Sequence, residues 1–227
     1  MIRFYFSPPQ PRQGHLVLEE AGLEYDAVPV DTRKGEQHTP DFKALNPNAK
    51  VPVIVDGETV VFDSNAILLY LAEKTGQFMP ADTAGARTDV FVADVRRQRY
   101  RSFQWPGSAF QALRAGHAPY SINRYDFEAW RHWLISSTNT SSNRPWMIGS
   151  DYSLVDMAVW GWARAVPFVL NAAAWNELPH VKRLLDEINA RPRRSVAEAL
   201  KDRFSFKAEM DDEANKAMFP QNARLPA

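Results

Sequence analysis

The chain has 227 residues, 45% of them hydrophobic, and its 27 basic side chains balance 27 acidic ones. This length and composition fit one large or two small domains with a buried core, and the balanced charge gives no reason to expect nucleic acid or an anionic membrane as a partner. The chain has no cysteine, which excludes disulfides, thiolate zinc sites and a redox-active thiol of the protein itself.

The first 30 residues show a strand, a helix and a second strand. Residues 2–6 are apolar and aromatic, as in a short strand, and the prolines of residues 7–12 end it. Residues 13–21 have a helical pattern with Gly22 as the left-handed stop, and residues 25–30 are predicted to form the second strand. This order predicts parallel strands joined by a right-handed crossover. The opening strand pattern argues against a signal peptide, and no apolar run reaches the ~18–20 residues of a membrane span, so we expect a cytoplasmic protein.

A hairpin and a strongly apolar helix follow. Residues 53–55 and 59–62 flank Asp56-Gly57, which is typical of a tight antiparallel hairpin. A helix is predicted from about residue 64 to 74, ended by Gly76, and its middle, AILLYLA, is apolar on every side. Such a helix cannot face water. We therefore expect one side of it to cover the sheet and another side to meet a second domain.

Only helical patterns follow the break at residues 80–85. They cover about residues 87–103, 121–136, 153–166, 178–190 and 192–201. The tail from residue 204 carries apolar anchors such as Phe206 and Met218, so we expect it to dock on this helical domain. The predicted domains are residues 1–80 and residues 87–227.

Several segments carry a resemblance to a known family. NPNAKVPVIVDG, VVFDSNAILLYLAEKTG and the helix start SLVDMAVWGWA resemble the cytosolic glutathione transferases, and the resemblance covers nearly the whole chain. DTRKGEQHTPDF and NRYDFEAW are similar to the bacterial nu-like branch, which includes enzymes that reduce disulfides with glutathione. The resemblance implies an α/β thioredoxin-like N-terminal domain (βαβ-ββα), an all-α C-terminal domain and a homodimer.

Two motifs are expected to hold glutathione. In the family, the peptide bond between Val51 and Pro52 is cis, and Val51 pairs with the cysteinyl part of the tripeptide as an added strand would. Asp63 is a good N-cap, and the helix N-terminus that it starts attracts anions. The resemblance implies that Ser64 and the neighbouring backbone amides bind the γ-glutamyl carboxylate. It also implies that Asp63 contacts the ammonium group of the ligand. The alternative for Val51-Pro52 is an ordinary proline that starts a strand. The alternative for Asp63 is a helix cap that does not bind a ligand.

Four further residues are weaker candidates for glutathione binding. By resemblance, Gln37 contacts the glycyl end of glutathione through its amide, and Lys50 or His38 could meet the same carboxylate. Arg124 matches an arginine that reaches a ligand carboxylate, a task suited to a guanidinium fork. The alternative for each is a solvated surface residue.

The turn at residues 7–12 is expected to decide the chemistry. An ordinary thiol has a pKa of about 8.5, and lowering it by ~2 units requires about 2.7 kcal/mol of thiolate stabilisation. A hydrogen-bond donor in this turn and the dipole of the first helix are the available sources. By resemblance Gln10 occupies the place of the nu-like asparagine, while Ser7 lies nearer the strand than the usual catalytic serine. Both are predicted as catalytic residues.

Other motifs are interpreted as structural. Ser153 and Asp156 have the spacing of a capping box. The five histidines show no metal-ligand spacing, so no metal is expected.

The sequence leaves the reaction open. A glutathione-dependent transferase acting on a small electrophile and a glutathione-dependent disulfide-bond reductase both fit, because glutathione would supply the thiol in each. The alternative from another class is a non-catalytic transferase-fold module that binds partners.

Overall fold

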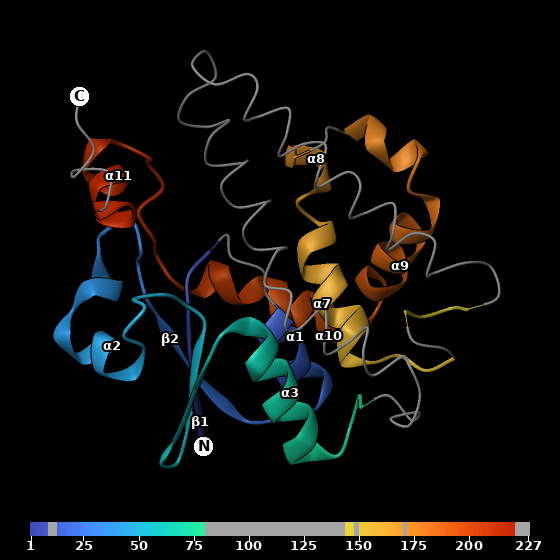
Figure 1. Ribbon diagram of the computed structural model, residues 1–227, viewed down its shortest axis with the longest axis horizontal. Coiled ribbons are helices and arrows are strands. Elements are labelled where there is room, and N and C mark those ends of the chain that lie inside the picture. Colours follow the sequence, from blue (N-terminus) through green and yellow to red (C-terminus); the bar gives the residue numbers. More distant parts are fainter. Residues whose placement is uncertain (9–12, 80–143, 148–149, 170–171, 221–227) are drawn as a thin grey trace. The chain divides into compact units, whose positions relative to one another are not determined.

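The computed structural model describes residues 1–8, 13–79, 144–147, 150–169 and 172–220 (Figure 1). The chain forms two compact units, Met1–Thr75 with Pro192–Ala227, and Gly76–Arg191. The predicted boundary at residues 80–87 lies outside the described residues. Each unit is described by itself.

The first unit is built on a four-stranded sheet with the order β2-β1-β3-β4. Its strands are β1 (Ile2–Phe6), β2 (Tyr25–Pro29), β3 (Val53–Asp56) and β4 (Thr59–Phe62). β1 pairs with β2 in parallel, and β3 pairs with both β1 and β4 in antiparallel orientation. The predicted parallel pair and the hairpin at Asp56-Gly57 are therefore confirmed, as is the thioredoxin-like fold of this region.

The alternation of side chains along β1 assigns the helices to the two faces of the sheet. Phe4 is buried and its ring lies 5.7 Å from that of His15 on α1 (Gln13–Glu20). Tyr5 points to the other face, where its ring lies 6.1 Å from that of Phe42 on α2 (Pro40–Leu45). Phe42 belongs to a buried cluster with Val30, Val51 and Val53. This cluster ties α2 to the start of β3.

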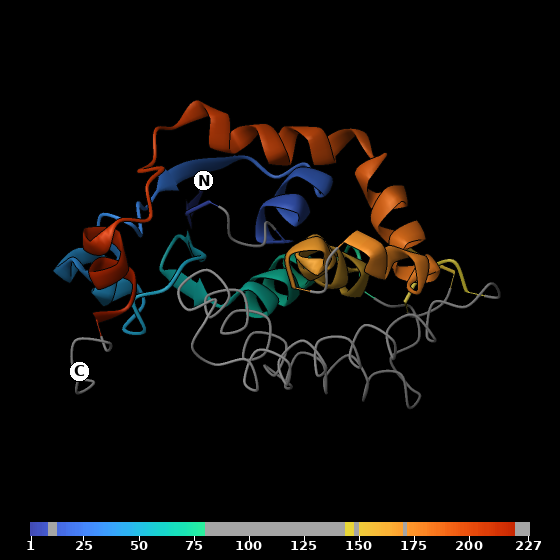
Figure 2. The ribbon, with the colours of Figure 1, turned by 90° about the horizontal axis from the view of Figure 1, so that it is seen from above.

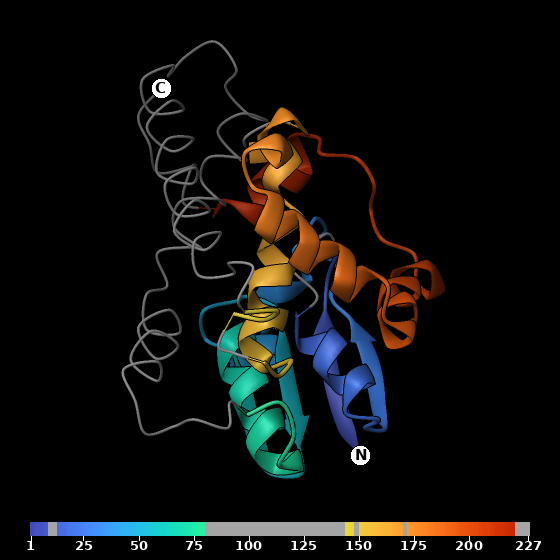
Figure 3. The ribbon, with the colours of Figure 1, turned by 90° about the vertical axis from the view of Figure 1, so that its right-hand side faces the viewer.

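A glycine allows close packing on the α1 face. α1 contacts α3 (Ser64–Thr75), and the two helices lie side by side in Figures 1 and 3. A Cβ added to Gly14 would lie 3.3 Å from Cγ2 of Ile67. α3 buries Ile67, Leu68, Leu71 and Ala72. The absence of a side chain at Gly14 therefore sets how near α1 comes to α3.

The last part of the chain belongs to the first unit. α10 (Pro192–Ala199) packs on α1 (Figure 2), and it is followed by η3 (Leu200–Arg203) and α11 (Asp212–Met218). The sequence placed this segment with the helical domain. The difference has a physical reason, because the rings of Phe204 and Phe206 lie 5.6 and 5.7 Å from the ring of Phe6 on β1. The apolar anchors of the tail were identified, but their partner strand was not.

The regular elements described in the second unit are helical. They are α7 (Leu154–Ala163), α8 (Val166–Val169), η2 (Ala172–Asn176) and α9 (Pro179–Asn189). α7 packs on α9, and the indole N–H of the buried Trp160 donates to Oδ1 of Asn189 at 3.0 Å. The helices predicted at residues 87–103 and 121–136 lie outside the described residues.

A buried carboxylate organises the start of α7. Asp156 accepts the backbone N–H and the hydroxyl of Ser153, each at 2.8 Å, and also the backbone N–H of Met147 at 2.8 Å. The predicted contact of the capping box, in which the Asp156 carboxylate accepts the N–H of Ser153, is confirmed. Burial raises the pKa of Asp156 to about 6, and the hydrogen bonds offset part of that rise.

Candidate functional site

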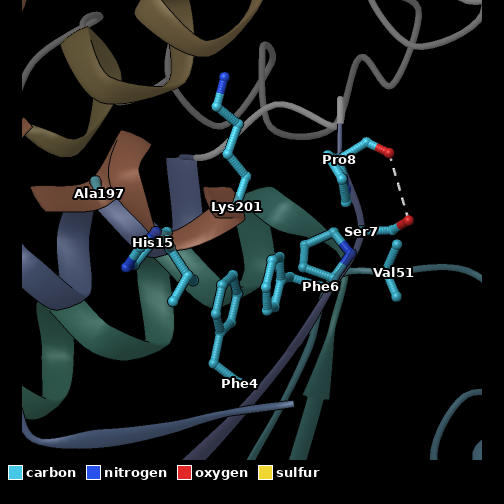
Figure 4. A pocket seen from close by; sticks show the side chains of 10 residues that line it. Phe4, Phe6, Ser7, Pro8, His15, Val51, Ala197 and Lys201 are labelled. Carbon is cyan, nitrogen blue, oxygen red and sulfur yellow. Dashed lines mark hydrogen bonds between the residues drawn. The ribbon is translucent and has the colours of Figure 1, made fainter. Parts of the chain in front are cut away.

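An apolar pocket lies in the first unit, at the end of β1 where the chain enters the proline-rich turn (Figure 4). The lining residues come from β1, α1, α10, η3 and two loop segments: Phe4, Phe6, Ser7, Pro8, His15, Val51, Pro52, Ala197, Leu200 and Lys201. The pocket thus brings together three residues that the sequence predicted for the site, namely Ser7, Val51 and Pro52.

The Val51-Pro52 peptide bond is cis, as predicted. The side chain of Val51 is buried in the cluster that α2 covers. Among the backbone hydrogen bonds of the described residues, none involves the N–H or C=O of Val51. These groups are therefore available to an extended ligand lying along the pocket edge.

Asn46 holds the loop that leads into Val51. It is buried, its Nδ2 donates to the carbonyl of Lys50 at 2.7 Å, and its Oδ1 accepts the N–H of Asn48 at 3.0 Å. Lys50 itself is exposed and does not line the pocket. The sequence analysis did not single out Asn46, although a side-chain amide that bonds to backbone two residues on is a known turn device and could have been found there.

The start of α3 has the cap that the sequence predicted. Oδ1 of Asp63 accepts the N–H of Asn65 at 2.9 Å, and its carbonyl accepts the N–H of Ile67 at 2.9 Å. Asp63 has φ = 84°, a left-handed conformation that a non-glycine residue adopts at a cost of about 1 kcal/mol or more. Ser64 is buried at the first helical position. Neither residue lines the pocket, and their contacts with a ligand stay a prediction.

Ser7 is buried directly after β1. Its Oγ lies 3.2 Å from Oγ1 of Thr32, and it donates to the carbonyl of Pro8 at 3.4 Å. Either hydroxyl of the Ser7–Thr32 pair can be the donor. When Thr32 donates, the proton of Ser7 can point at another acceptor. Gln10 and Arg124 lie outside the described residues, so their predicted roles stay predictions.

Gln37 is buried on η1 (Glu36–His38), away from the residues that line the pocket. Its Nε2 donates to the carbonyl of Thr32 at 3.2 Å and to the carbonyl of Ala217 at 3.1 Å. Both amide hydrogens thus have partners, while Oε1 has none among the described residues. His38 also contacts the carbonyl of Ala217, at 2.9 Å. Gln37 is joined to Ser7 through Thr32, a residue that the sequence analysis did not name.

His15, which lines the pocket, belongs to a partly buried polar network. Nε2 of His15 is hydrogen bonded to the hydroxyl of Tyr25, which donates to Glu19 at 2.5 Å. Burial, and then the hydrogen bond to Glu19, raise the pKa of Tyr25 far above its usual range. Tyr25 therefore stays protonated and serves as a donor. The network anchors α1 to β2.

The C-terminal segment supplies the remaining wall. Ala197 comes from α10, and Leu200 and Lys201 come from η3. Of the described residues that line the pocket, Lys201 alone is a lysine or arginine. Nothing local in the sequence identifies it, because more than 140 positions separate it from Pro52, the nearest lining residue outside the C-terminal segment.

No group of three or more histidine, cysteine, aspartate or glutamate side chains that could hold a metal ion occurs among the described residues. Within the same part of the chain, no helix is long and apolar enough to span a membrane.

Comparisons with known proteins give a consistent result. Residues 4–73 match the family model of the glutathione S-transferase N-terminal domain. The chain is 35% identical to the disulfide-bond oxidoreductase YfcG of Escherichia coli (strain K12), over 94% of this chain and 98% of that protein.

Solved structures agree with the sequence comparisons. A glutathione transferase family member from Pseudomonas fluorescens pf-5, with two glutathione bound, is similar with a TM-score of 0.77 and 28% identity, over 86% of this chain and 91% of that one. A glutathione transferase from Pseudomonas putida, with one glutathione disulfide bound per subunit, is similar with a TM-score of 0.77 and 26% identity, over 88% and 91%.

Proposed function

The chain belongs to the glutathione transferase family, and from this membership we propose that it is an enzyme that uses the thiol of glutathione to reduce disulfides. Conjugation of glutathione to a small electrophile is the second activity that the same site supports. Reduction comes first because YfcG, which is named a disulfide-bond oxidoreductase, aligns over almost the whole chain. The two similar Pseudomonas transferases hold glutathione or its disulfide.

The observation that carries the proposal is the meeting of Ser7 and Val51 at one apolar pocket. The N–H and C=O of Val51 would pair with the cysteinyl backbone of glutathione, as a sheet edge pairs with an added strand. The thiol of that residue would then lie over the end of β1, close to the proline-rich turn. Ser64 at the start of α3 would bind the γ-glutamyl carboxylate.

The chemistry requires a thiolate, and the protein has no thiol of its own. The thiolate of one glutathione attacks a sulfur of the disulfide, the S–S bond breaks, and the departing thiolate takes a proton. A second glutathione thiolate then attacks the glutathione sulfur of the mixed disulfide and releases the other thiol. Two glutathione molecules become one glutathione disulfide, and the two electrons pass to the substrate's sulfurs.

Two residues of the turn are proposed to stabilise the thiolate. The Ser7 hydroxyl can donate to sulfur while it accepts from Thr32. Gln10 can donate through its amide. The N-terminus of α1 adds a favourable dipole.

Disulfide turnover tests the proposal. Purified protein is mixed with glutathione and bis(2-hydroxyethyl) disulfide, and the glutathione disulfide formed is measured with NADPH and glutathione reductase. We expect turnover well above the uncatalysed rate. Binding of glutathione without turnover of disulfides or of aromatic electrophiles would favour the non-catalytic module. Absence of glutathione binding would exclude both glutathione-dependent activities, disulfide reduction and conjugation.

Two further features are part of the proposal. We expect a homodimer, as is usual for this fold, and gel filtration at the monomer mass would contradict it. We also expect a cytoplasmic location, where reduced glutathione is abundant, and cell fractionation would test it.

A further inference from the structure

The pocket is closed on one side by residues from the far end of the chain. Leu200 and Lys201 lie on η3, which α10 and the ring of Phe204 hold against α1 and β1. In Figure 4 the Lys201 side chain extends away from the rings of Phe4 and Phe6, so its methylene stem borders the pocket and its ammonium reaches the rim. Its side chain is 48% exposed. A positive charge therefore lies at the edge of an apolar pocket.

Within the part of the chain that the structure describes, this charge has one weak ionic partner. The Lys201 ammonium lies 3.9 Å from Oδ1 of Asp202, whose side chain is 70% exposed. Lys207, by contrast, contacts Asp211 and Glu213, each at 2.9 Å, and Lys182 contacts Asp186 at 2.6 Å. A long, exposed contact such as that with Asp202 contributes little. The Lys201 ammonium can thus accept an anionic partner without breaking a strong ion pair.

We propose that Lys201 selects co-substrates that carry a carboxylate near the reacting bond. This inference rests on the proposed function, and it assigns a substrate class to the same site. The aromatic and aliphatic walls suit the methylene groups and sulfurs of a small disulfide. The ammonium at the rim then discriminates by charge, since it attracts a carboxylate and repels an amine.

Three disulfides of similar size test the inference by their charge. They are 3,3′-dithiodipropionate, a dianion, bis(2-hydroxyethyl) disulfide, which is neutral, and cystamine, a dication. For Lys201→Met, we expect kcat/KM for the dianion to fall about five- to twentyfold, with less than a twofold change for the neutral disulfide. Lys201→Glu should invert the order of dianion and dication, and Lys201→Arg should keep the preference for the dianion. Lys182→Met, a lysine of similar exposure in the other unit, should change none of the three.

The alternatives give different results. An equal loss for all three disulfides, or a weaker affinity of Lys201→Met for glutathione in calorimetric titration, would show that Lys201 acts on folding or on glutathione itself and would overturn the inference. Turnover by the wild type without charge discrimination would overturn it as well. Wild-type protein that turns over none of the three would overturn the proposed function, and the inference falls with it.

Discussion

The backbone N–H of Lys207 donates to the buried carboxylate of Asp31 at 2.7 Å, although 176 positions separate the two residues. The same carboxylate accepts the N–H of Arg33 at 3.1 Å, and the Arg33 guanidinium donates to the carbonyl of Lys207 at 2.8 Å. Farther along, the carbonyl of Ala217 on α11 accepts a hydrogen bond from the side-chain amide of Gln37. The C-terminal segment is thus fastened to the loop that runs from β2 to α2.

Removal of the Asp31 carboxylate should loosen this attachment. Asp31→Ala leaves the N–H groups of Arg33 and Lys207 without their acceptor, and an unpaired buried group costs about 1–3 kcal/mol. We expect the free energy of unfolding in urea to fall by about 2–3 kcal/mol, with faster hydrogen exchange at the Lys207 amide. Asp41→Ala, an exposed position on α2, should cost less than about 0.5 kcal/mol. Equal effects of the two substitutions would contradict the attachment.

The loop before Val51 should matter for glutathione affinity. Asn46→Ala removes the amide that fixes the carbonyl of Lys50, so Val51 is presented less rigidly to an extended ligand. We expect KM for glutathione to rise about five- to tenfold with kcat nearly unchanged, the pattern of lost ground-state binding. Asn48→Ala, at an exposed position of the same loop, serves as the control. A fall in kcat at constant KM would show that Asn46 acts on the chemistry instead.

Asp156 should make stability depend on pH. Its pKa is raised from 3.8 to about 6 by burial, so the folded state binds the proton more tightly than the unfolded state does. The stability that protonation adds is fully present below about pH 4 and is lost as the pH rises through about 6, a change of about 3 kcal/mol.

Asp156→Asn cannot titrate, and it isolates this contribution. The wild type minus variant difference in unfolding free energy should grow as the pH falls from 7 to 4. A difference that is constant over this range would contradict the raised pKa.

The hydroxyl of Tyr25 should contribute more to the free energy of unfolding than the hydroxyl of a tyrosine outside any hydrogen-bond network. Tyr25→Phe leaves His15 and Glu19 buried without their shared partner, and we expect a loss of about 1–3 kcal/mol in thermal or urea unfolding. Among the described residues, the hydroxyl of Tyr5 forms no hydrogen bond, so Tyr5→Phe is the control. Equal stability of the two variants would show that the network contributes nothing.

Local patterns were enough to predict the first unit's sheet and the Asp63 cap. Asp56-Gly57 specified the hairpin, because few dipeptides match the twist of a two-residue turn, and Gly22 marked the end of α1. The cis bond before Pro52 came from the family resemblance rather than from the residues alone. These features depend on neighbours within a few positions, or on a motif about 30 residues long.

The rest of the site depends on contacts between distant parts of the chain. Lys201 and Leu200 reach the pocket because η3 returns to β1, and no periodicity in the sequence encodes that return. The pairing of Gln37 with Ala217 has the same origin. The sequence did show that Phe206 is an apolar anchor, but a hydrophobic residue fits many surfaces, so its partner Phe6 could not be deduced.

The pKa of the thiol in bound glutathione shows whether the protein activates glutathione or only holds it. It can be measured as the pH dependence of thiolate absorbance near 240 nm in the complex, with Gln10→Ala and Ser7→Ala as comparisons. We expect a pKa about two units below the ordinary value of about 8.5. The pKa should rise again when the activating donor is removed. A bound thiol with its ordinary pKa would show that the protein holds glutathione without activating it, and would contradict the claim that it is a glutathione-dependent enzyme.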